Sequence, residues 1–290
     1  MPILNLIFPI FLITLTGYLY GKVKQIDHQG VTNLILYVTS PALIFTTLIS
    51  KKIYFSTIYP LIGGAFFVIL ASGCIVFLFL RAIKKKELTG FYLPTIFMNS
   101  SFLGYPVTLF AFGPAGLSEA IIYDISNGIL IFSLGVYIVS RKGIGEGFKL
   151  PLLYVTFLAI GLNLLNIKIT PLIIQPLSMI GLATIPLMLL ILGYRLNLVK
   201  ISHFGLSITG ALIRVGFGFA FGCLFVSFFH ISGLTAKIIV LMSSLPSPFN
   251  AFILSEKFNA NPELAASTVT ISTLLGIITI PLVLWILGAA

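Results

Sequence analysis

The stretch MNSSFLGYPVTLFAFG, at residues 98–113, places Asn, Ser, Gly and Pro in the middle of an otherwise apolar run. A second stretch of the same kind, MSSLPSPFNAFILSEKF, occupies residues 242–258. Proline lacks a backbone N–H and restricts the residue before it, so we expect Pro106 to push Tyr105 out of the helical region. Pro246 acts in the same way in the second stretch. Both stretches therefore predict apolar helices that break near their centre.

The composition around these stretches is typical of a membrane protein. Hydrophobic residues make up 58% of the 290 residues, charged residues only 8%, and the mean hydropathy is +1.14, whereas a soluble domain has about a quarter of its residues charged. The apolar runs continue over about twenty residues, as in helices that cross the bilayer, and do not alternate as barrel strands do. In lipid, every backbone polar group must be paired inside the protein. We therefore expect an all-α membrane protein.

Ten membrane-spanning helices can be drawn through the chain. No basic segment precedes the first apolar run, so we expect it to be a membrane span rather than a cleaved signal peptide. In chain order, the predicted spans are 3–21, 31–49, 58–80, 90–112, 117–140, 150–167, 174–194, 203–229, 236–255 and 263–287.

Apart from Arg214, which lies inside the eighth span, the Lys and Arg residues lie between the predicted spans or at their ends. They form no patch interleaved with aromatic residues, so the net charge of +10 does not indicate a nucleic-acid partner. Cytoplasmic loops carry an excess of Lys and Arg. This rule predicts a multi-pass protein of the cell (inner) membrane with both termini outside the cytoplasm. The cytoplasmic side holds Lys22, Lys24, Arg81, Lys84, Lys85, Lys86, Arg141, Lys142, Lys149, Arg195, Lys200 and Lys257, and the opposite side holds Lys51, Lys52, Lys168 and Lys237.

The two halves of the chain share residues at a common offset. Met98 begins a polar segment as Met242 does, and Pro41 in the second span matches Pro186 in the seventh. The hydrophilic stretch RKGIGEGFK, at 141–149, lies between the halves. Because each half has five spans, the second must enter the membrane in the opposite orientation, which gives an inverted repeat. The predicted repeats are 1–145 and 146–290.

The two predicted helix breaks are the expected binding site. Unpaired backbone groups are tolerated in a membrane only where they are buried in protein or face a water-filled cavity. The N-terminus of a half-helix presents free N–H groups and the positive end of the helix dipole, which favour an anion. The alternative is a pair of proline kinks that serve packing alone. The residues expected at the site are Asn99, Ser100, Ser101, Gly104, Pro106, Pro246, Ser247, Pro248 and Asn250.

Four further residues are candidates for ion coupling, because an ionisable group at membrane depth is costly and is by default functional. Asp124, with Asn127 three residues on, is either a proton acceptor or cation ligand, or a partly hydrated residue paired with its neighbours. Arg214 either balances a carboxylate or snorkels to the interface. Glu256 is a candidate only if it faces the cavity. We expect no metal or cofactor. Coupling to H⁺, coupling to Na⁺ and uniport driven by the membrane potential are the alternatives, and the sequence shows no dense cluster of oxygen ligands that would favour a dedicated Na⁺ site.

At these residues the chain resembles the auxin efflux carrier family, which includes bacterial carboxylate permeases and the plant PIN-FORMED carriers. The resemblance extends over nearly the whole chain, in the family's order. The similar segments are FPIFLITLTGYLYGK (8–22) in the first span, LYVTSPALIF (36–45) in the second, NSSFLGYP (99–106) in the fourth, IYDISNGILIF (122–132) in the fifth, and LPSPFNAFILSEKFNANPELAA (245–266) from the ninth onwards.

The resemblance implies a fold similar to that of bile-acid symporters. Spans 1, 2, 6 and 7 would form a scaffold that is often dimeric, so we expect a homodimer. Spans 3–5 and 8–10 would form a mobile transport domain in which the broken helices four and nine cross. Asn99 matches the asparagine that reaches a substrate carboxylate in the plant carriers, and Pro106 and Pro246 match the crossing prolines. The nine-residue central loop and the segment PSPFN differ from the plant carriers, which favours a small carboxylate such as malate or malonate over auxin.

These features together predict a secondary transporter, or permease, that moves a small organic anion by alternating access of the elevator type. An inverted repeat can supply inward-open and outward-open states of similar energy. A membrane enzyme would need a nucleophile with a base, paired acids or metal ligands, and we recognise no such set, so enzymatic activity is not expected. An anion channel and a non-transporting sensor on the same fold remain alternatives.

Overall fold

The computed structural model describes residues 3–50, 52–140, 151–199 and 201–289. These residues fold almost entirely into helices, and no strand occurs among them. The predicted boundary between the two halves, at 141–149, lies outside the described residues. The expected all-α class is therefore confirmed for the part of the chain that the structure describes.

The helices follow the order of the apolar runs. The first half contains α1 (Ile3–Val23), α2 (His28–Leu34), the π-helix η1 (Ile35–Thr39), α3 (Ser40–Ser50), α4 (Phe55–Ala82), the 3-10 helix η2 (Thr89–Phe91), α5 (Tyr92–Ile96), α6 (Gly104–Leu130), the π-helix η3 (Ile131–Gly135) and α7 (Val136–Ser140). The second half contains α8 (Pro151–Leu164), α9 (Pro171–Leu182), α10 (Thr184–Leu196), α11 (Phe204–Phe228), α12 (Gly233–Ser243), α13 (Phe249–Lys257) and α14 (Pro262–Ile286).

Several of these helical stretches are long and apolar enough to cross a membrane. Shorter apolar helices lie at Ile7–Val23, Pro151–Leu164 and Gly233–Ser243. Among the described residues the structure therefore has the spans of a multi-span membrane protein. The six long stretches are His28–Ser50, Phe55–Ala82, Gly104–Ser140, Pro171–Leu196, Phe204–Phe228 and Pro262–Ile286.

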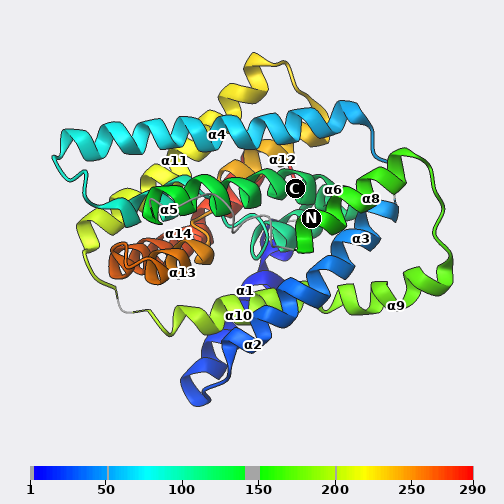
Figure 1. Cartoon of the computed structure of the whole chain (residues 1–290), viewed down its shortest axis with the longest axis horizontal. Helices are drawn as coiled ribbons and strands as arrows, with labels where there is room; N and C mark the ends of the chain where they lie inside the picture. The colour runs from blue at the N-terminus through cyan, green and yellow to red at the C-terminus, as the bar shows by residue number, and fades with distance from the viewer. Residues whose placement is uncertain (1–2, 51, 141–150, 200, 290) are drawn as a thin grey trace.

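The helices pack in two groups (Figure 1). In one group α1 lies along α10, and α3 packs against α8 and α9. In the other, α4, α6, α11, α12 and α14 pack against one another, with α13 against α14. Contacts between the groups are made chiefly by α6, which touches α1, α3, α8 and α10, and by α14, which touches α1. The chain thus forms two packed units that meet along α6 and α14.

The backbones of α1 and α10 approach each other closely at two glycines. A Cβ added to Gly193 would overlap the carbonyl oxygen of Thr14, and one added to Gly17 would overlap that of Leu190. Small residues let membrane helices pack at short distance, where van der Waals contact replaces the hydrophobic drive that lipid does not provide. Glycine is therefore required at both positions for this helix pair.

The predicted boundary between the fourth and fifth spans lies inside α6. We expected one span to end at 112 and the next to begin at 117, and α6 consists of two helical segments that meet at a sharp kink at Gly113. Gly113 has φ 67° and ψ −164°, a backbone conformation that glycine adopts without a Cβ clash. Pro114, which follows, has the fixed φ that suits the start of a new helical segment. The turn between the two segments is therefore made by a Gly-Pro pair.

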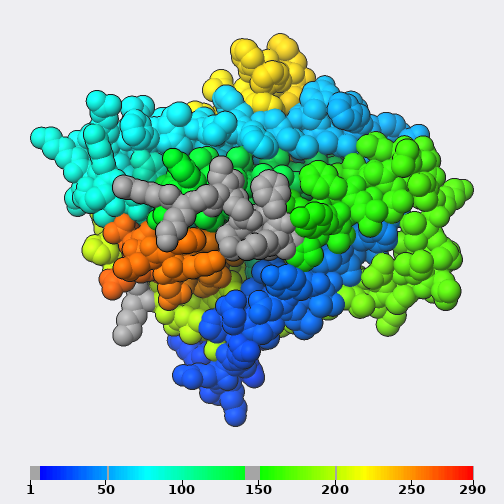
Figure 2. Space-filling view, viewed as in Figure 1, coloured from blue at the N-terminus to red at the C-terminus, as the bar shows by residue number. Residues whose placement is uncertain are grey.

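The outer surface carries large apolar side chains. Leu172, Met179 and Phe228 expose 81%, 75% and 72% of their surfaces. In the space-filling view, α4 borders the visible face along one edge, and α8 and α9 border it along another (Figure 2). A surface of this kind is stable against lipid tails but would associate in water, which agrees with membrane-spanning helices.

Candidate binding site at two helix breaks

Two helix breaks lie against each other inside the second group of helices. The first runs from the end of α5 at Ile96 to the start of α6, and its first residue, Phe97, is extended (φ −89°, ψ 155°). The second runs from the end of α12 to Pro248, which is also extended (φ −80°, ψ 145°). The backbone N–H of Asn99 donates to the carbonyl oxygen of Pro246 at 2.8 Å. Both breaks therefore occur within the predicted stretches, and a backbone hydrogen bond joins them.

The prediction for Pro106 is wrong about the position of the break. We expected this proline to force Tyr105 out of the helical region, but both residues lie in the first turn of α6, which begins at Gly104. The N–H groups of a first turn have no intrahelical partner, so a proline there removes no helical hydrogen bond. The residues before it, 97–103, leave the helical path instead.

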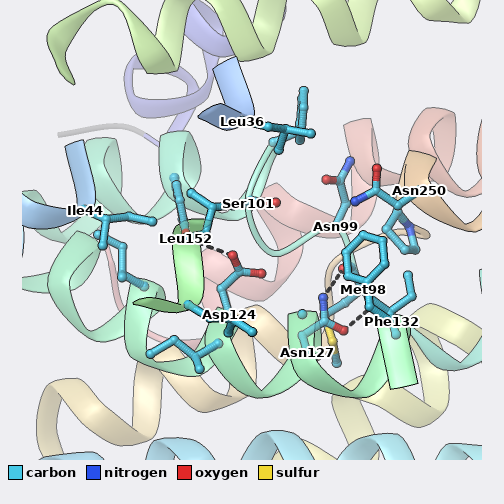
Figure 3. A pocket seen from close by; sticks show the side chains of 18 of the residues that line it. Leu36, Ile44, Met98, Asn99, Ser101, Asp124, Asn127, Phe132, Leu152 and Asn250 are labelled. Atoms are coloured by element: carbon cyan, nitrogen blue, oxygen red, sulfur yellow. Dashed lines mark hydrogen bonds between the residues drawn. The ribbon is translucent and has the colours of Figure 1, made fainter. Parts of the chain in front are cut away.

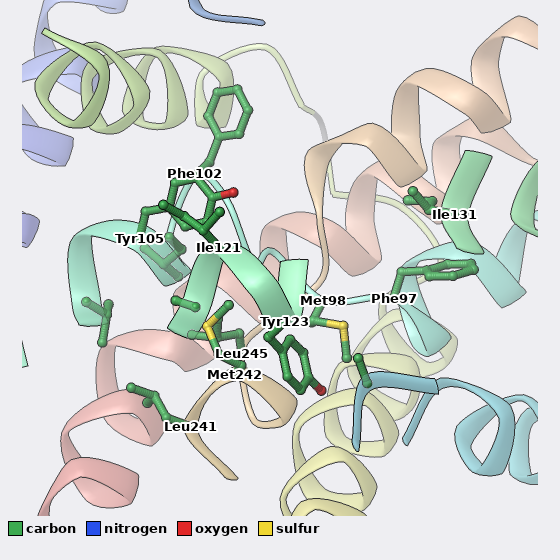
Figure 4. Packing of buried hydrophobic residues seen from close by; sticks show 14 of the residues in the cluster. Phe97, Met98, Phe102, Tyr105, Ile121, Tyr123, Ile131, Leu241, Met242 and Leu245 are labelled. Atoms are coloured by element: carbon green, nitrogen blue, oxygen red, sulfur yellow. The ribbon is translucent and has the colours of Figure 1, made fainter. Parts of the chain in front are cut away.

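Gly104 allows the start of α6 to pack closely on the end of α12. A Cβ at this position would lie 2.9 Å from the Met242 sulfur and from a methyl group of Leu245. Met98 and Tyr123 belong to the same buried cluster, and Figure 4 shows their side chains beside those of Met242 and Leu245. Gly104 and Pro106 therefore serve the packing around the crossing and do not line the cavity described below.

Arg214, in the middle of α11, binds the ends of both broken helices. Its guanidinium donates to the carbonyl oxygen of Ile96, where α5 ends, and to that of Ser243, where α12 ends. The terminal carbonyls of a helix lack intrahelical partners and carry the negative end of the helix dipole, so a cation is favourable there. The side chain is fully buried. The expectation that it snorkels to the interface is therefore wrong, because it is bound between two helix ends.

Side chains of the following spans hold the backbone of each break. Asn127, on α6, donates from Nδ2 to the Met98 carbonyl oxygen at 2.9 Å. On the other side, the Ser272 hydroxyl of α14 accepts from the Ser247 N–H at 3.0 Å. The Ser247 hydroxyl itself donates to the Pro94 carbonyl oxygen and is buried. These bonds give the non-helical segments fixed positions within the protein.

Asp124 is bound by one residue of the first break, Ser100, and by one residue of the first turn of α6, Tyr105. Its carboxylate accepts hydrogen bonds from the Ser100 hydroxyl and, at 2.7 Å, from the Tyr105 hydroxyl. The Ser100 hydroxyl also lies 2.7 Å from the Asn127 amide nitrogen. The coupling candidates Asp124 and Asn127 thus form one polar network with Ser100 and Tyr105.

A cavity lies between this network and the first group of helices. The space open to the centres of water molecules in this cavity is about 70 Å³, which is room for several of them. Figure 3 shows Asp124 facing this space from α6, and Asn99 of the first break next to Asn250 of α13. Leu36 and Leu152 face it from the opposite helix group. The predicted site residues that line it are Asn99, Ser101, Asp124, Asn127, Pro248 and Asn250.

Asn99 presents a free donor at this cavity. Its side chain is 3% exposed, and among the described residues Nδ2 has no hydrogen-bond partner. A buried polar group without a partner costs free energy and calls for an explanation such as a ligand or water. Glu256, in contrast, is exposed near the end of α13 and does not line the cavity. Glu256 was a coupling candidate only if it faced the cavity, and in this conformation it does not.

The position predicted for Arg195 is wrong. We counted it among the cytoplasmic loop cations, but it lies in the last turn of α10 and is 1% exposed. Its guanidinium donates to the Thr32 hydroxyl at 2.7 Å and lies over the rings of Phe249 and Phe102. The predicted end of the seventh span fell one residue too early to include it. Five other counted cations lie outside the described residues: Lys51, Arg141, Lys142, Lys149 and Lys200.

Comparison with known proteins finds relatives along nearly the entire chain. A family model described as membrane transport protein matches residues 2–148 and 136–284. An uncharacterised transporter of Methanocaldococcus jannaschii is 29% identical over 305 aligned residues, covering 98% of each chain. An uncharacterised transporter of Methanothermobacter thermautotrophicus is 28% identical over 295 residues, covering 94% of each. The matched regions include both helix breaks.

Proposed function

The chain belongs to the membrane transport protein family, of which the auxin efflux carriers are members, and from this premise we propose that it is a secondary transporter of a small organic anion. The group that it recognises is a carboxylate, and the binding site is the cavity at the two crossing breaks. The cargo is moved by alternating access of the elevator type. The protein acts as a permease and not as an enzyme.

The observation that carries this proposal is the unpaired amide donor of Asn99 at the cavity. An N–H group without a partner is satisfied best by an acceptor, and a charged acceptor such as a carboxylate makes the stronger hydrogen bond. Asn250, in the first turn of α13 after the second break, lines the same cavity and adds a second amide. The N-termini of α6 and α13, which follow the two breaks, add positive dipole ends.

Asp124 gives a physical reason for proton coupling. An ionised Asp124 in the same small cavity would repel a carboxylate, because like charges interact strongly where water is excluded. A proton on Asp124 removes the repulsion, and the neutral acid can accept from one of the Ser100 and Tyr105 hydroxyls through its carbonyl oxygen while its own O–H donates to the other. We therefore assign H⁺ as the coupling ion and Asp124 as its carrier, with Asn127 as a polar neighbour.

Ten spans in an inverted repeat are part of the proposal. Its support is that a short helix, a break and a second helix occur once in each half, as α5–α6 and as α12–α13. Pro41 and Pro186 also stand at similar points, near the starts of α3 and α10. The repeats are 1–145 and 146–290, and by the distribution of Lys and Arg both termini lie outside the cytoplasm.

The two packed groups of helices support a division into scaffold and transport domain. The scaffold is formed by α1, α2, α3, α8, α9 and α10, and the transport domain contains the two breaks. An anion bound at the breaks would move with the transport domain past the scaffold helices that close the cavity. Two copies of the chain would associate through the scaffold as a homodimer in the cell (inner) membrane.

Ligand binding and counterflow test this proposal. Purified protein is heated with acetate, lactate, malonate, malate, succinate or citrate, since a ligand that binds the folded state raises its unfolding temperature. Any anion that does so is then loaded into proteoliposomes, and uptake of the same labelled anion is followed. We expect at least one carboxylate to stabilise the protein and to support saturable counterflow.

Each other outcome has a distinct meaning. Stabilisation without flux would indicate a sensor, and flux that rises linearly with concentration without counterflow would indicate a channel. If no carboxylate stabilises the protein and none is transported, the anion proposal is wrong. In that case, amines and neutral solutes tested in the same way would show which other class of cargo the family member carries.

A further inference from the structure

Arg195 is a buried cation that has no counter-charge in the part of the chain that the structure describes. Its side chain is 1% exposed, and one of its three guanidinium nitrogens donates to the Thr32 hydroxyl at 2.7 Å. Nε and Nη1 have no hydrogen-bond partner among the described residues. No carboxylate in the described part of the chain pairs with this residue either. Arg214, the other fully buried arginine, is instead bound by two helix-end carbonyl oxygens.

Two aromatic rings take the place of a counter-charge. The guanidinium carbon of Arg195 lies 4.1 Å from the ring centre of Phe249 and 5.8 Å from that of Phe102. A ring face attracts a cation, but more weakly than a carboxylate held at the same distance does in a dry site. The two rings therefore hold the guanidinium in place but compensate its positive charge only in part.

These rings also separate Arg195 from the binding cavity. Phe102 belongs to the first break and Phe249 begins α13, directly after the second break, and both line the cavity. Arg195 lies on α10, in the helix group that forms the proposed scaffold. The contact between the cation and the rings thus crosses the boundary along which the two groups would move.

We propose that Arg195 is a second anion-recognition residue, which the Phe102 and Phe249 rings cover in this conformation. When the transport domain moves along α10, the rings leave the guanidinium, and a carboxylate entering or leaving the cavity takes their place. Arginine suits this role because its planar group both stacks on a ring and binds a carboxylate through two parallel hydrogen bonds. The inference rests on the proposed transport of an anion and adds the residue that selects for its charge.

The first test measures anion affinity with defined probes. Unfolding of purified wild type, Arg195→Gln and Arg195→Lys is followed while malonate, and then acetate, is titrated. We expect Arg195→Gln to weaken malonate binding at least tenfold, and to weaken acetate binding less, because the dianion depends more on a cation. Arg195→Lys keeps the charge but not the paired hydrogen bonds, so we expect an intermediate affinity. Arg81→Gln, an exposed change at the end of α4, is the control.

The second test needs no knowledge of the substrate. In a chain that carries Cys74→Ser and Cys223→Ser, an Arg195→Cys variant is treated in proteoliposomes with a membrane-impermeant thiosulfonate reagent. We expect modification although position 195 is buried in this conformation, and faster modification when Phe249→Ala is added. Leu189→Cys, equally buried on the same helix, is the matched control and should stay unmodified.

The outcomes separate this inference from the proposed function. If malonate binds wild type and Arg195→Gln equally, or if Arg195→Cys is never modified, the role of Arg195 is refuted while anion transport stands. If no anion binds wild type or is transported by it, the proposed function fails and the inference fails with it. Equal modification of Leu189→Cys would show general opening of the scaffold and would also refute the specific role.

Discussion

The backbone N–H of Asn99 donates a 2.8 Å hydrogen bond to the carbonyl oxygen of Pro246, so each helix break holds the other in place. The chain around Asn99 is fixed on its second side by Asn127, which binds the adjacent Met98 carbonyl oxygen. A non-helical segment that is anchored in this way can present a side chain in one orientation. The unpaired amide of Asn99 is therefore held ready at the cavity without the cost of ordering it on binding.

Replacing Asn99 by Ala should strongly reduce uptake while leaving the fold intact. A hydrogen bond to a charged group contributes about 1.5–3 kcal/mol, which corresponds to roughly a ten- to hundredfold loss of affinity. Affinity is measured by ligand-induced stabilisation, and transport by counterflow in proteoliposomes. Asn33→Ala, at an exposed helical position on α2, should behave as wild type. Normal transport by Asn99→Ala would remove this residue from the site.

Replacing Asp124 by Asn should remove the pH dependence of transport. The amide resembles the protonated acid in shape and carries no charge, so the variant stays in the state that binds the anion at every pH. Wild-type uptake should rise as the external pH is lowered from 8 to 5, because a proton must enter with the anion. Counterflow at both pH values is the measurement, with the exposed Glu256→Gln as control. If Asp124→Asn keeps the wild-type profile, another group carries the proton.

The helical class and the two helix breaks could be predicted, because each depends on residues close together in the sequence. The apolar runs predicted helices, and Ser, Asn, Gly and Pro within two of these runs predicted the breaks. Pro106 was less informative than expected, because proline is as compatible with a first helical turn as with a break. The sequence therefore indicates that a break exists nearby but not its first and last residues.

The contacts that organise the site could not be predicted, because they join residues far apart in the chain. Arg214 binds Ile96 and Ser243, and nothing near it in sequence indicates either partner. Arg195 shows the opposite difficulty: a cation at the edge of a predicted span looks the same whether it faces solvent or the interior. Its burial follows from the packing of α10 against α1 and α2, which only the tertiary structure shows.

Replacing Arg214 by Met should destabilise the protein. Met keeps much of the apolar stem, but the Ile96 and Ser243 carbonyl oxygens lose their donor, and each buried group left unpaired costs about 1–3 kcal/mol. The removal of a buried charge offsets part of this cost. We expect the unfolding temperature in detergent to fall by about 5 °C or more. Arg81→Met, at an exposed position, is the control, and equal stability of the two variants would show that Arg214 does not hold the helix ends together.

The contact between α1 and α10 can be tested with two glycines that differ only in their surroundings. In Gly193→Ala, the new methyl group would overlap the Thr14 carbonyl oxygen on α1, and relief requires the helices to move apart. Overpacking of this kind costs about 1–3 kcal/mol, so thermal unfolding should begin at a lower temperature. Gly161, on α8, has nothing within 4 Å of an added Cβ, and Gly161→Ala should gain about 0.5–1 kcal/mol from the higher helix propensity of alanine. The substitution is the same at both positions, so the opposite signs of the two stability changes follow from the difference in packing around them. If both variants are stabilised, α1 and α10 do not lie as close as this structure places them.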